Sequence, residues 1–196
     1  MNEYELVVIG SGVGLSVLSE AVENGLKCAL VEDGKMGGTC LTRGCIPSKI
    51  LIYPADVIRQ AEHARVIGVN LKVERVDWKL IAQRMWSQIN ESNDIEKSLA
   101  SAENLDVYHG VGEFTGNYEM RVKLNDGSGY SKPFKGKKFV IASGARSFIP
   151  PIEGIEDVGY ITNETFFGDK FPDQPYESLI IVGGGVIAAE FAHMFS

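Results

Sequence analysis

The first 32 residues constrain the fold more than any other part of the chain. A continuous apolar run at Leu6–Ile9 has the composition of a parallel strand buried on both faces. A glycine-rich loop and an amphipathic helix follow, and we expect the helix to end at about Asn24. A second apolar strand at 27–31 then leads to Glu32. This order of strand, glycine loop, helix, strand and acid is typical of a dinucleotide-binding α/β domain.

The loop glycines and the acid have separate roles in such a site. Gly10, Gly12 and Gly14 let the backbone approach a pyrophosphate, and the helix N-terminus attracts its negative charge. Glu32 would accept hydrogen bonds from ribose hydroxyls. Leu15 stands where the usual fingerprint has a third glycine, which normally permits close packing of the helix on the strand. We therefore expect the helix to lie slightly further from the sheet, or to tilt.

A second feature is a pair of cysteines, Cys40 and Cys45, five positions apart. On a regular helix this spacing separates the Cα atoms by more than a disulfide allows, so the backbone would have to deviate at Gly38 and Gly44. Pro47 suits the first turn of a helix, which would place Cys45 at a helix N-terminus. The positive end of the helix dipole favours a thiolate there. The pattern predicts a redox-active disulfide.

Two other interpretations of the cysteine pair are open. A structural disulfide across so few residues would close a small loop and add little stability. A structural zinc site needs about four ligands. The chain offers only one further cysteine and three scattered histidines as additional ligands: Cys28, His63, His109 and His193. Cys28 lies on the second predicted strand and is expected to be a small buried hydrophobic residue.

Composition limits the class of protein. The chain has 196 residues, a formal net charge of −7 and a pI near 5.0, which suits a soluble globular protein. The negative charge disfavours a nucleic acid or an acidic membrane as partner. No apolar run approaches the roughly 20 residues of a membrane span. Three cysteines in a chain that opens on a strand, without an export signal, predict the cytoplasm.

The glycine loop and the cysteine pair, in this order, resemble the pyridine nucleotide–disulfide oxidoreductases. This family of flavoenzymes includes dihydrolipoamide dehydrogenase, glutathione reductase, mercuric reductase and mycothione reductase. The resemblance implies an α/β, Rossmann-like FAD/NAD(P)-binding fold with a parallel sheet and a β-meander, here truncated. FAD would be the first nucleotide, lined also by Gly38 and Thr39. Cys40 would be the interchange thiol that attacks the substrate disulfide, and Cys45 would lie against the flavin.

The resemblance gives roles to residues that otherwise attract no attention. Lys49 would approach the flavin and pair with Glu190, both as part of the catalytic machinery. Without the resemblance, Lys49 is a solvated helix lysine and Glu190 a surface charge. Gly112 lies in a stretch whose backbone would meet the adenine. Ser143 and Gly144 would form the second FAD-contact motif, with serine in place of the usual threonine.

The resemblance also divides the chain. Residues 1–148 would form the first segment of an FAD-binding domain, 149–177 a linker, and 178–196 the start of a truncated NAD(P)-binding domain. There, Gly183 and Gly185 repeat the phosphate-loop pattern after an apolar strand. The position that chooses between NAD and NADP would fall about 20 residues beyond this loop. The nicotinamide preference is therefore left open.

Periodicity predicts the remaining elements. The helix predicted at 78–102 has an apolar stripe that is expected to pack in a core: Ile81, Met85, Ile89, Ile95 and Leu99. The helices are expected at 46–65 and 78–102, and the strands at 107–111, 114–124, 130–134 and 139–142, with a turn at 125–129.

The resemblance implies that the intact protein passes electrons between NAD(P)H, FAD, the Cys40–Cys45 disulfide and a small disulfide or dithiol substrate. Dihydrolipoamide dehydrogenase is the first expectation, and a mercuric or mycothione reductase-type enzyme or a non-catalytic FAD-binding fragment is the alternative. Family members are homodimers whose C-terminal interface domain supplies a His–Glu pair. None of the histidines His63, His109 and His193 lies in a recognisable base motif, so each is expected to be a surface or hydrogen-bonded residue. We expect an N-terminal portion without turnover of its own.

Overall fold

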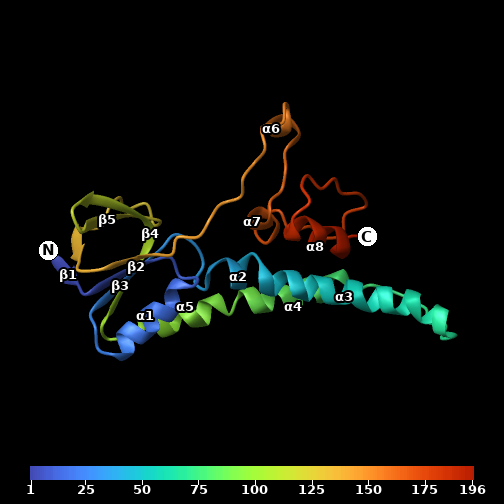
Figure 1. The fold of residues 1–196 in the computed structure, drawn as a ribbon, viewed down its shortest axis with the longest axis horizontal. Helices are drawn as coiled ribbons and strands as arrows, with labels where there is room; N and C mark the ends of the chain where they lie inside the picture. The colour runs from blue at the N-terminus through green and yellow to red at the C-terminus, as the bar shows by residue number, and fades with distance from the viewer. The chain divides into compact units, whose positions relative to one another are not determined.

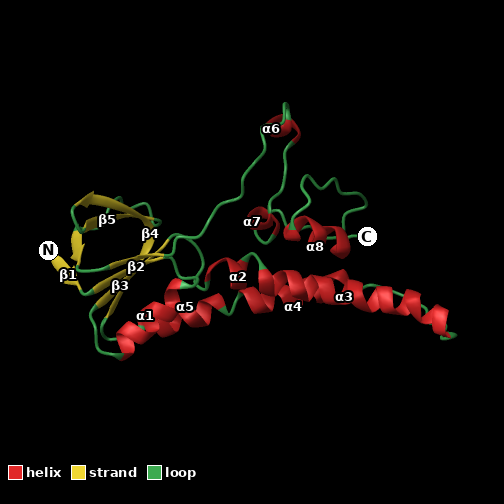
Figure 2. Cartoon of the chain, in the orientation of Figure 1, coloured by secondary structure: helices red, strands yellow, loops and turns green.

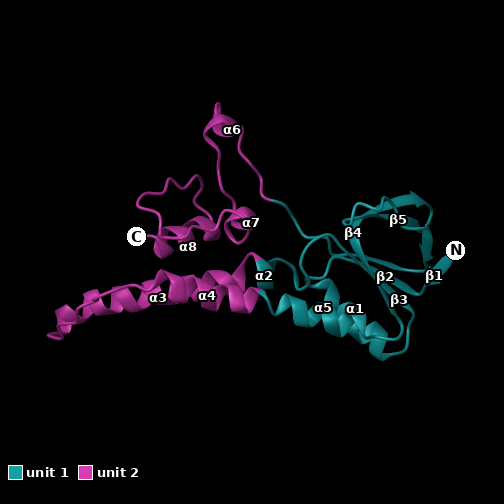
Figure 3. Ribbon diagram, turned by 180° about the vertical axis from the view of Figure 1, so that it is seen from behind, with its two compact units in different colours: residues 1–42, 90–146 teal, residues 43–89, 147–196 magenta.

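The computed structural model describes residues 1–196, and Figure 1 shows the order of its elements. The chain divides into two compact units, residues 1–42 with 90–146 and residues 43–89 with 147–196 (Figure 3). All seven strands belong to the first unit, and the second unit is built from helices and loops (Figure 2). The domain boundaries predicted after residues 148 and 177 stay predictions. None of the helices has both the length and the apolar character needed to cross a membrane.

The first unit contains a mixed seven-stranded sheet in the order β1-β6-β5-β4-β3-β2-β7. Its strands are β1 (Asn2–Tyr4), β2 (Leu6–Ile9), β3 (Cys28–Glu32), β4 (Leu105–Gly116), β5 (Glu119–Leu124), β6 (Phe134–Gly136) and β7 (Phe139–Ile141). Strand β2 is parallel to β3 and β7, and β3 is parallel to β4, whereas β5 is antiparallel to both of its neighbours. The expected α/β fold with a β-meander is confirmed, and the sheet, predicted to be parallel, is mixed but mostly parallel.

Strand β4 joins the parallel part of the sheet to the meander. Its first half pairs with β3 as far as His109, and from Gly110 onward it pairs with β5. Gly110 has φ +154°, and an added Cβ would lie 2.0 Å from the carbonyl oxygen of Lys123. Only glycine fits at this close approach between β4 and β5.

The strand predicted at 114–124 is wrong, because a turn at Asn117 and Tyr118 separates β4 from β5. Tyr118 adopts φ +54°, and the Gly116–Asn117 pair was the turn signal that the prediction missed. The strand predicted at 130–134 is also much reduced. Only a single bridge at Tyr130 and the first residue of β6 fall within it.

The two faces of the sheet follow the alternation of strand side chains. Leu6 and Val8 of β2 face helices α1 (Gly14–Glu23) and α5 (Ser92–Ala100), whereas Val7 packs on the meander side. Cys28 is fully buried in the helix-side core, as expected for a small hydrophobic residue. Each face therefore has its own apolar core.

Helix α1 packs closely on the sheet although residue 15 is Leu15. The contact is made at Gly14, where an added Cβ would lie 2.7 Å from Val8 Cγ1 and 3.2 Å from Ala142 Cβ. Leu15 packs at the margin of the helix-side core. The missing third glycine therefore does not keep the helix away from the strand.

The second unit is organised around an aromatic core. Its helices are α3 (Cys45–Ala64), the 3₁₀ turn Arg65–Ile67, α4 (Trp78–Ile89), α6 (Ile155–Val158), α7 (Asn163–Phe166) and α8 (Val186–Met194). Phe166 is fully buried and contacts the rings of Phe167, Phe171, Phe191 and Phe195. These contacts hold α7 and α8 in one cluster with Trp78 of α4.

The single helix predicted at 78–102 is two helices, α4 and α5, separated at Asn90 and Glu91. The polar run that begins at Asn90 competes for backbone hydrogen bonds and favours a helix end. The predicted apolar stripe is confirmed as core packing, but it serves two cores: Met85 and Ile89 are buried in the second unit, and Ile95 packs in the first.

The apolar segment 178–182 does not form the predicted strand. Ile180 and Val182 are 92% and 64% exposed. Since every strand of the chain lies in the first unit, this segment has no sheet neighbour within its own unit. The glycine loop and the helix that should follow are both present, because Gly185 caps α8.

Candidate functional site

The first candidate site lies at the carboxyl ends of the parallel strands. Gly10 follows β2, Glu32 ends β3, and Ser143 comes two residues after β7. Parallel strands bring these ends to one edge of the sheet, where nucleotides bind in this class of fold. Gly10 has φ +100°, and an added Cβ would lie 2.2 Å from the carbonyl oxygen of Ala142. The first glycine loop and the segment that leads to Ser143 are therefore in direct backbone contact.

The same loop also contacts the segment that leads into the cysteine pair. An added Cβ on Gly38, which has φ +67°, would lie 2.4 Å from Gly12 Cα. The N–H of Gly37 donates to Ser11 Oγ at 3.1 Å, and Ser11 is fully buried. The sequence prediction missed the role of Ser11 as the anchor of this contact. The sequence signal for this contact was the glycine pair Gly37–Gly38, because both residues adopt a positive φ, which glycine accepts most readily.

Glu32 is held at the glycine loop. Its carboxylate accepts hydrogen bonds from the N–H of Ser11 and the N–H of Gly34, both at 2.7 Å. The N–H groups of Gly12 and Val13, just before α1, donate to no group within the chain. A bare backbone cradle, a helix N-terminus and a carboxylate suit the pyrophosphate and ribose of a dinucleotide.

The other residues predicted for the first nucleotide occupy two kinds of position. Thr39, Ser143 and Gly144 are exposed, and Gly144 has φ +72°. Gly112 instead adjoins the core, because an added Cβ would lie 3.1 Å from Met120 Sδ. Its contact with adenine stays a prediction, as do the cofactor roles of the others.

The second candidate site begins at Cys45, the first residue of α3. Gly44 caps this helix, and its carbonyl accepts the N–H of Ser48 at 3.0 Å. Ser48 Oγ donates to the Cys45 carbonyl at 3.2 Å, and Pro47 is buried in the first turn. The predicted position of Cys45 at a helix N-terminus is confirmed, and the residue is exposed. Cys40 is an exposed residue of α2 (Gly38–Thr42) in the first unit, and its pairing with Cys45 stays a prediction.

One turn after Cys45, Lys49 forms an ion pair with Glu190 of α8. Lys49 Nζ also lies 3.4 Å from Ser48 Oγ. The hydrogen bond from Lys49 is the main cause that lowers the pKa of Glu190, with a smaller contribution from Ser48, while partial burial opposes both. The structure thus brings together the lysine and glutamate predicted by resemblance, 141 positions apart in sequence. Their roles toward a flavin stay predictions.

The histidines are placed as expected for surface or hydrogen-bonded residues. His193 of α8 lies with Nε2 2.8 Å from an Asp56 carboxylate oxygen of α3. His109 lies 3.7 Å from Glu96, and His63 is exposed. A further bond from Arg59 to Ser196 continues the polar contacts between α3 and the C-terminal segment.

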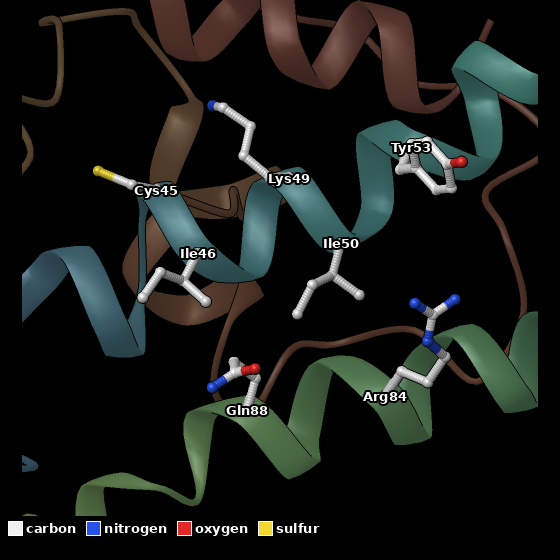
Figure 4. A pocket seen from close by; sticks show the side chains of 7 residues that line it. All are labelled: Cys45, Ile46, Lys49, Ile50, Tyr53, Arg84 and Gln88. Atoms are coloured by element: carbon white, nitrogen blue, oxygen red, sulfur yellow. The ribbon is translucent and has the colours of Figure 1, made fainter.

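An open pocket of about 490 Å³ adjoins Cys45 between α3 and α4 (Figure 4). Ile46 and Ile50 line it from α3, and Arg84 and Gln88 add polar groups from α4. Cys45 is therefore accessible from solvent on a partly apolar face of the helix.

Comparison with known proteins gives the site its context. The family model for pyridine nucleotide-disulphide oxidoreductases matches residues 4–196. The chain is 35% identical to a mycothione reductase of Mycobacterium tuberculosis, over 100% of the chain and 42% of that protein. It is 31% identical to a dihydrolipoyl dehydrogenase of Acholeplasma laidlawii, over 100% of the chain and 57% of that protein.

A solved structure gives the same result for the fold. The Cu(II) complex of the HOCl-induced flavoprotein disulfide reductase RclA from Escherichia coli superposes with a TM-score of 0.79 at 31% identity. The match covers 100% of the chain and 40% of RclA, so the chain spans about two fifths of the length of that relative. A family model that covers nearly the whole chain, together with these likenesses, establishes that the chain belongs to the pyridine nucleotide–disulphide oxidoreductase family.

Proposed function

We propose that the chain forms the FAD-binding and redox-disulfide part of a flavoprotein disulfide oxidoreductase that acts on a small disulfide or dithiol. The observation that carries the proposal is the exposed Cys45 at the N-terminus of α3, one turn from the Lys49–Glu190 ion pair. The glycine cradle at Gly10 and Gly12, with Glu32 beside it, supports a bound dinucleotide.

FAD, when bound, would supply two-electron transfer between a nicotinamide and the disulfide. The chain's own residues would hold and exchange the electrons at sulfur. The Cys40 thiolate attacks one sulfur of the substrate disulfide, and the other sulfur leaves as a thiolate that takes a proton. The Cys45 thiolate then attacks the mixed disulfide at Cys40 and releases the second substrate thiol. Two protein thiols are oxidised to one disulfide, and one substrate disulfide is reduced to two thiols.

The helix N-terminus and the ion pair support these steps. The positive end of the α3 dipole lies at Cys45, where negative charge develops on sulfur during exchange. The Lys49 side chain lies one helical turn after Cys45, and its ion pair with Glu190 orients it. The lipoamide–dihydrolipoamide couple is the first substrate we propose, and the steps above run in reverse when dihydrolipoamide is oxidised. The 35% identity to mycothione reductase favours a mycothiol-type disulfide as the second. For the whole protein we further propose a homodimer in the cytoplasm that uses NAD or NADP.

The test is a thiol–disulfide exchange experiment. The reduced chain is treated with oxidised lipoamide, alkylated, and digested for peptide mapping by mass spectrometry. We expect an intrachain Cys40–Cys45 disulfide, while Cys28, which is fully buried, is recovered as the alkylated thiol after denaturation. The matched controls are Cys40→Ser and Cys45→Ser, which should each stop at a mixed disulfide or remain reduced. Recovery of both Cys40 and Cys45 as thiols from the wild-type chain would refute the proposal.

A further inference from the structure

The Arg43–Gly44 connection between α2 and α3 is held by the first turn of α7. Asn163 Nδ2 donates to the Arg43 carbonyl oxygen at 3.1 Å, across 120 positions of sequence. The next residue, Glu164, lies with Oε2 3.6 Å from Arg43 Nη1. Backbone and side chain of Arg43 are therefore both fixed by two consecutive residues of α7. These contacts lie within the second unit.

Helix α7 is itself well fixed. Thr162 and Thr165 form a capping box: the Thr162 N–H donates to Thr165 Oγ1 at 2.9 Å, and Thr162 Oγ1 accepts the Thr165 N–H at 3.4 Å. The helix ends at Phe166, which is fully buried in the aromatic core. A short helix tied at both ends is a rigid support for the side chains of its first turn.

The orientation of the Asn163 amide is also determined. Its Oδ1 accepts a hydrogen bond from Ser147 Oγ at 3.2 Å. Because the Arg43 carbonyl can only accept, the amide nitrogen Nδ2 must face it, and Oδ1 is then left to accept from the Ser147 hydroxyl. The amide bridges the segment at Ser147 and the connection before Cys45.

The contacts add little to stability. The Arg43 and Glu164 side chains are 36% and 35% exposed, and ion pairs of this exposure contribute little to folding. Their location is more informative, because Arg43 lies between the two cysteines of the proposed redox pair. We propose that Asn163 and Glu164 are positioning residues for that pair. By holding Arg43, they restrict the backbone conformations of the segment between Cys40 and Cys45, which must let the two sulfur atoms form a disulfide. The proposal rests on the proposed function of the two cysteines.

The consequence is a shift in the dithiol–disulfide equilibrium. Release of Arg43 gives the dithiol form more backbone conformations, and disulfide closure must then remove them. Closure oxidises two thiols, and its two electrons and two protons reduce one disulfide of the buffer to two thiols. We therefore expect loss of the anchor to lower the equilibrium constant for closure by about tenfold. For a two-electron couple this corresponds to a midpoint potential about 30 mV less negative.

The experiment compares three substitutions in the full chain. Asn163→Asp keeps the acceptor for Ser147 but removes the donor to Arg43, and Glu164→Gln removes only the ion pair. The matched control is Glu113→Gln, because the Glu113–Arg121 pair has nearly the same exposure, 39% and 40%, and lies in the first unit. Each chain is equilibrated in a series of reduced and oxidised dithiothreitol mixtures and alkylated. The Cys40–Cys45 disulfide is then quantified by mass spectrometry.

We expect the midpoint to move for Asn163→Asp, to move less for Glu164→Gln, and to stay at the wild-type value for Glu113→Gln. An Asn163→Asp midpoint equal to that of the control overturns the positioning role and leaves the proposed function intact. A wild-type chain that forms no Cys40–Cys45 disulfide overturns both. Far-UV circular dichroism checks that each variant is folded. If Asn163→Asp is not folded, the Glu164→Gln midpoint decides, and its agreement with the control overturns the proposal.

Discussion

Substitution of Gly10 by alanine tests the backbone contact on which the nucleotide cradle depends. Gly10 has φ +100°, which alone costs an L-residue about 1–2 kcal/mol. The new Cβ would also lie 2.2 Å from the Ala142 carbonyl oxygen. That carbonyl cannot retreat easily, because the Ala142 N–H donates to the Ile9 carbonyl at 2.8 Å and keeps the segment after β7 against β2. Overpacking of this kind costs about a further 1–3 kcal/mol.

We therefore expect Gly10→Ala to lower the free energy of unfolding of the first unit by about 2–5 kcal/mol. The matched control is Gly127→Ala, since Gly127 has φ +78° but an added Cβ would meet nothing within 4 Å. The control should lose only the backbone contribution of about 1–2 kcal/mol.

Hydrogen exchange of peptides from β2 and β3 is the suitable assay for Gly10→Ala. Tryptophan fluorescence would report the other unit, because Trp78 and Trp86 both lie there. Exchange rates measured across a urea series give the free energy of opening for each variant. If the two variants, Gly10→Ala and Gly127→Ala, lose the same free energy of opening within about 0.5 kcal/mol, the Ala142 carbonyl does not clash with a Cβ at position 10. That result would refute the reasoning.

The remaining predictions concern the second unit. Phe166→Ala should lower its free energy of unfolding by about 3–5 kcal/mol in urea titrations followed by tryptophan fluorescence, because Phe166 is fully buried. Phe148→Ala, at an 84% exposed position, should stay within about 0.5 kcal/mol of wild type, and equal losses in the two variants would contradict the assigned core. Glu190→Gln should cost about 0.5 kcal/mol near neutral pH, since Lys49 is 59% exposed and its charge is screened. Because the pKa of Glu190 is lowered in the fold, this contribution is present above the unfolded pKa and is lost as pH falls through the folded pKa. Thermal unfolding of the wild type and Glu190→Gln should therefore converge in acid, and an unchanged difference would count against the ion pair.

Local sequence pattern was sufficient where the signal is contained in one short segment. Strands β2, β3 and β7 and helices α1 and α3 all lie within a few residues of their predicted ranges. Each combines an apolar run or stripe with a clear boundary, such as the glycine loop at Gly10 or Pro47 in the first turn of α3. The predicted position of Cys45 depended on that proline alone.

Features that depend on distant parts of the chain could not be predicted from pattern. The change of partner at Gly110 depends on β5, and the absence of a strand at 178–182 depends on the lack of a neighbour. The apolar periodicity of the sequence continues through the break at Asn90. It therefore did not indicate that the two halves of the stripe pack in different cores. The contact of Asn163 with Arg43 joins residues with no local signal in common.

The resemblance contributed what physical pattern could not. The Lys49–Glu190 pair was expected only because family members have it, and the structure brings these two side chains together. The same resemblance did not indicate Ser11, whose buried hydroxyl ties the glycine loop to Gly37. That hydroxyl is evident only from the three-dimensional contact.

The visible absorbance spectrum of the chain tests the central claim most directly. The chain is incubated with FAD, freed of unbound FAD, and measured before and after addition of dihydrolipoamide. The account predicts flavin absorbance that stays with the protein and a new long-wavelength band on reduction. That band should be absent in Cys45→Ser and present in Cys28→Ala. Flavin that washes away, or a band that persists in Cys45→Ser, would contradict the claim that this chain binds FAD beside a redox-active Cys45.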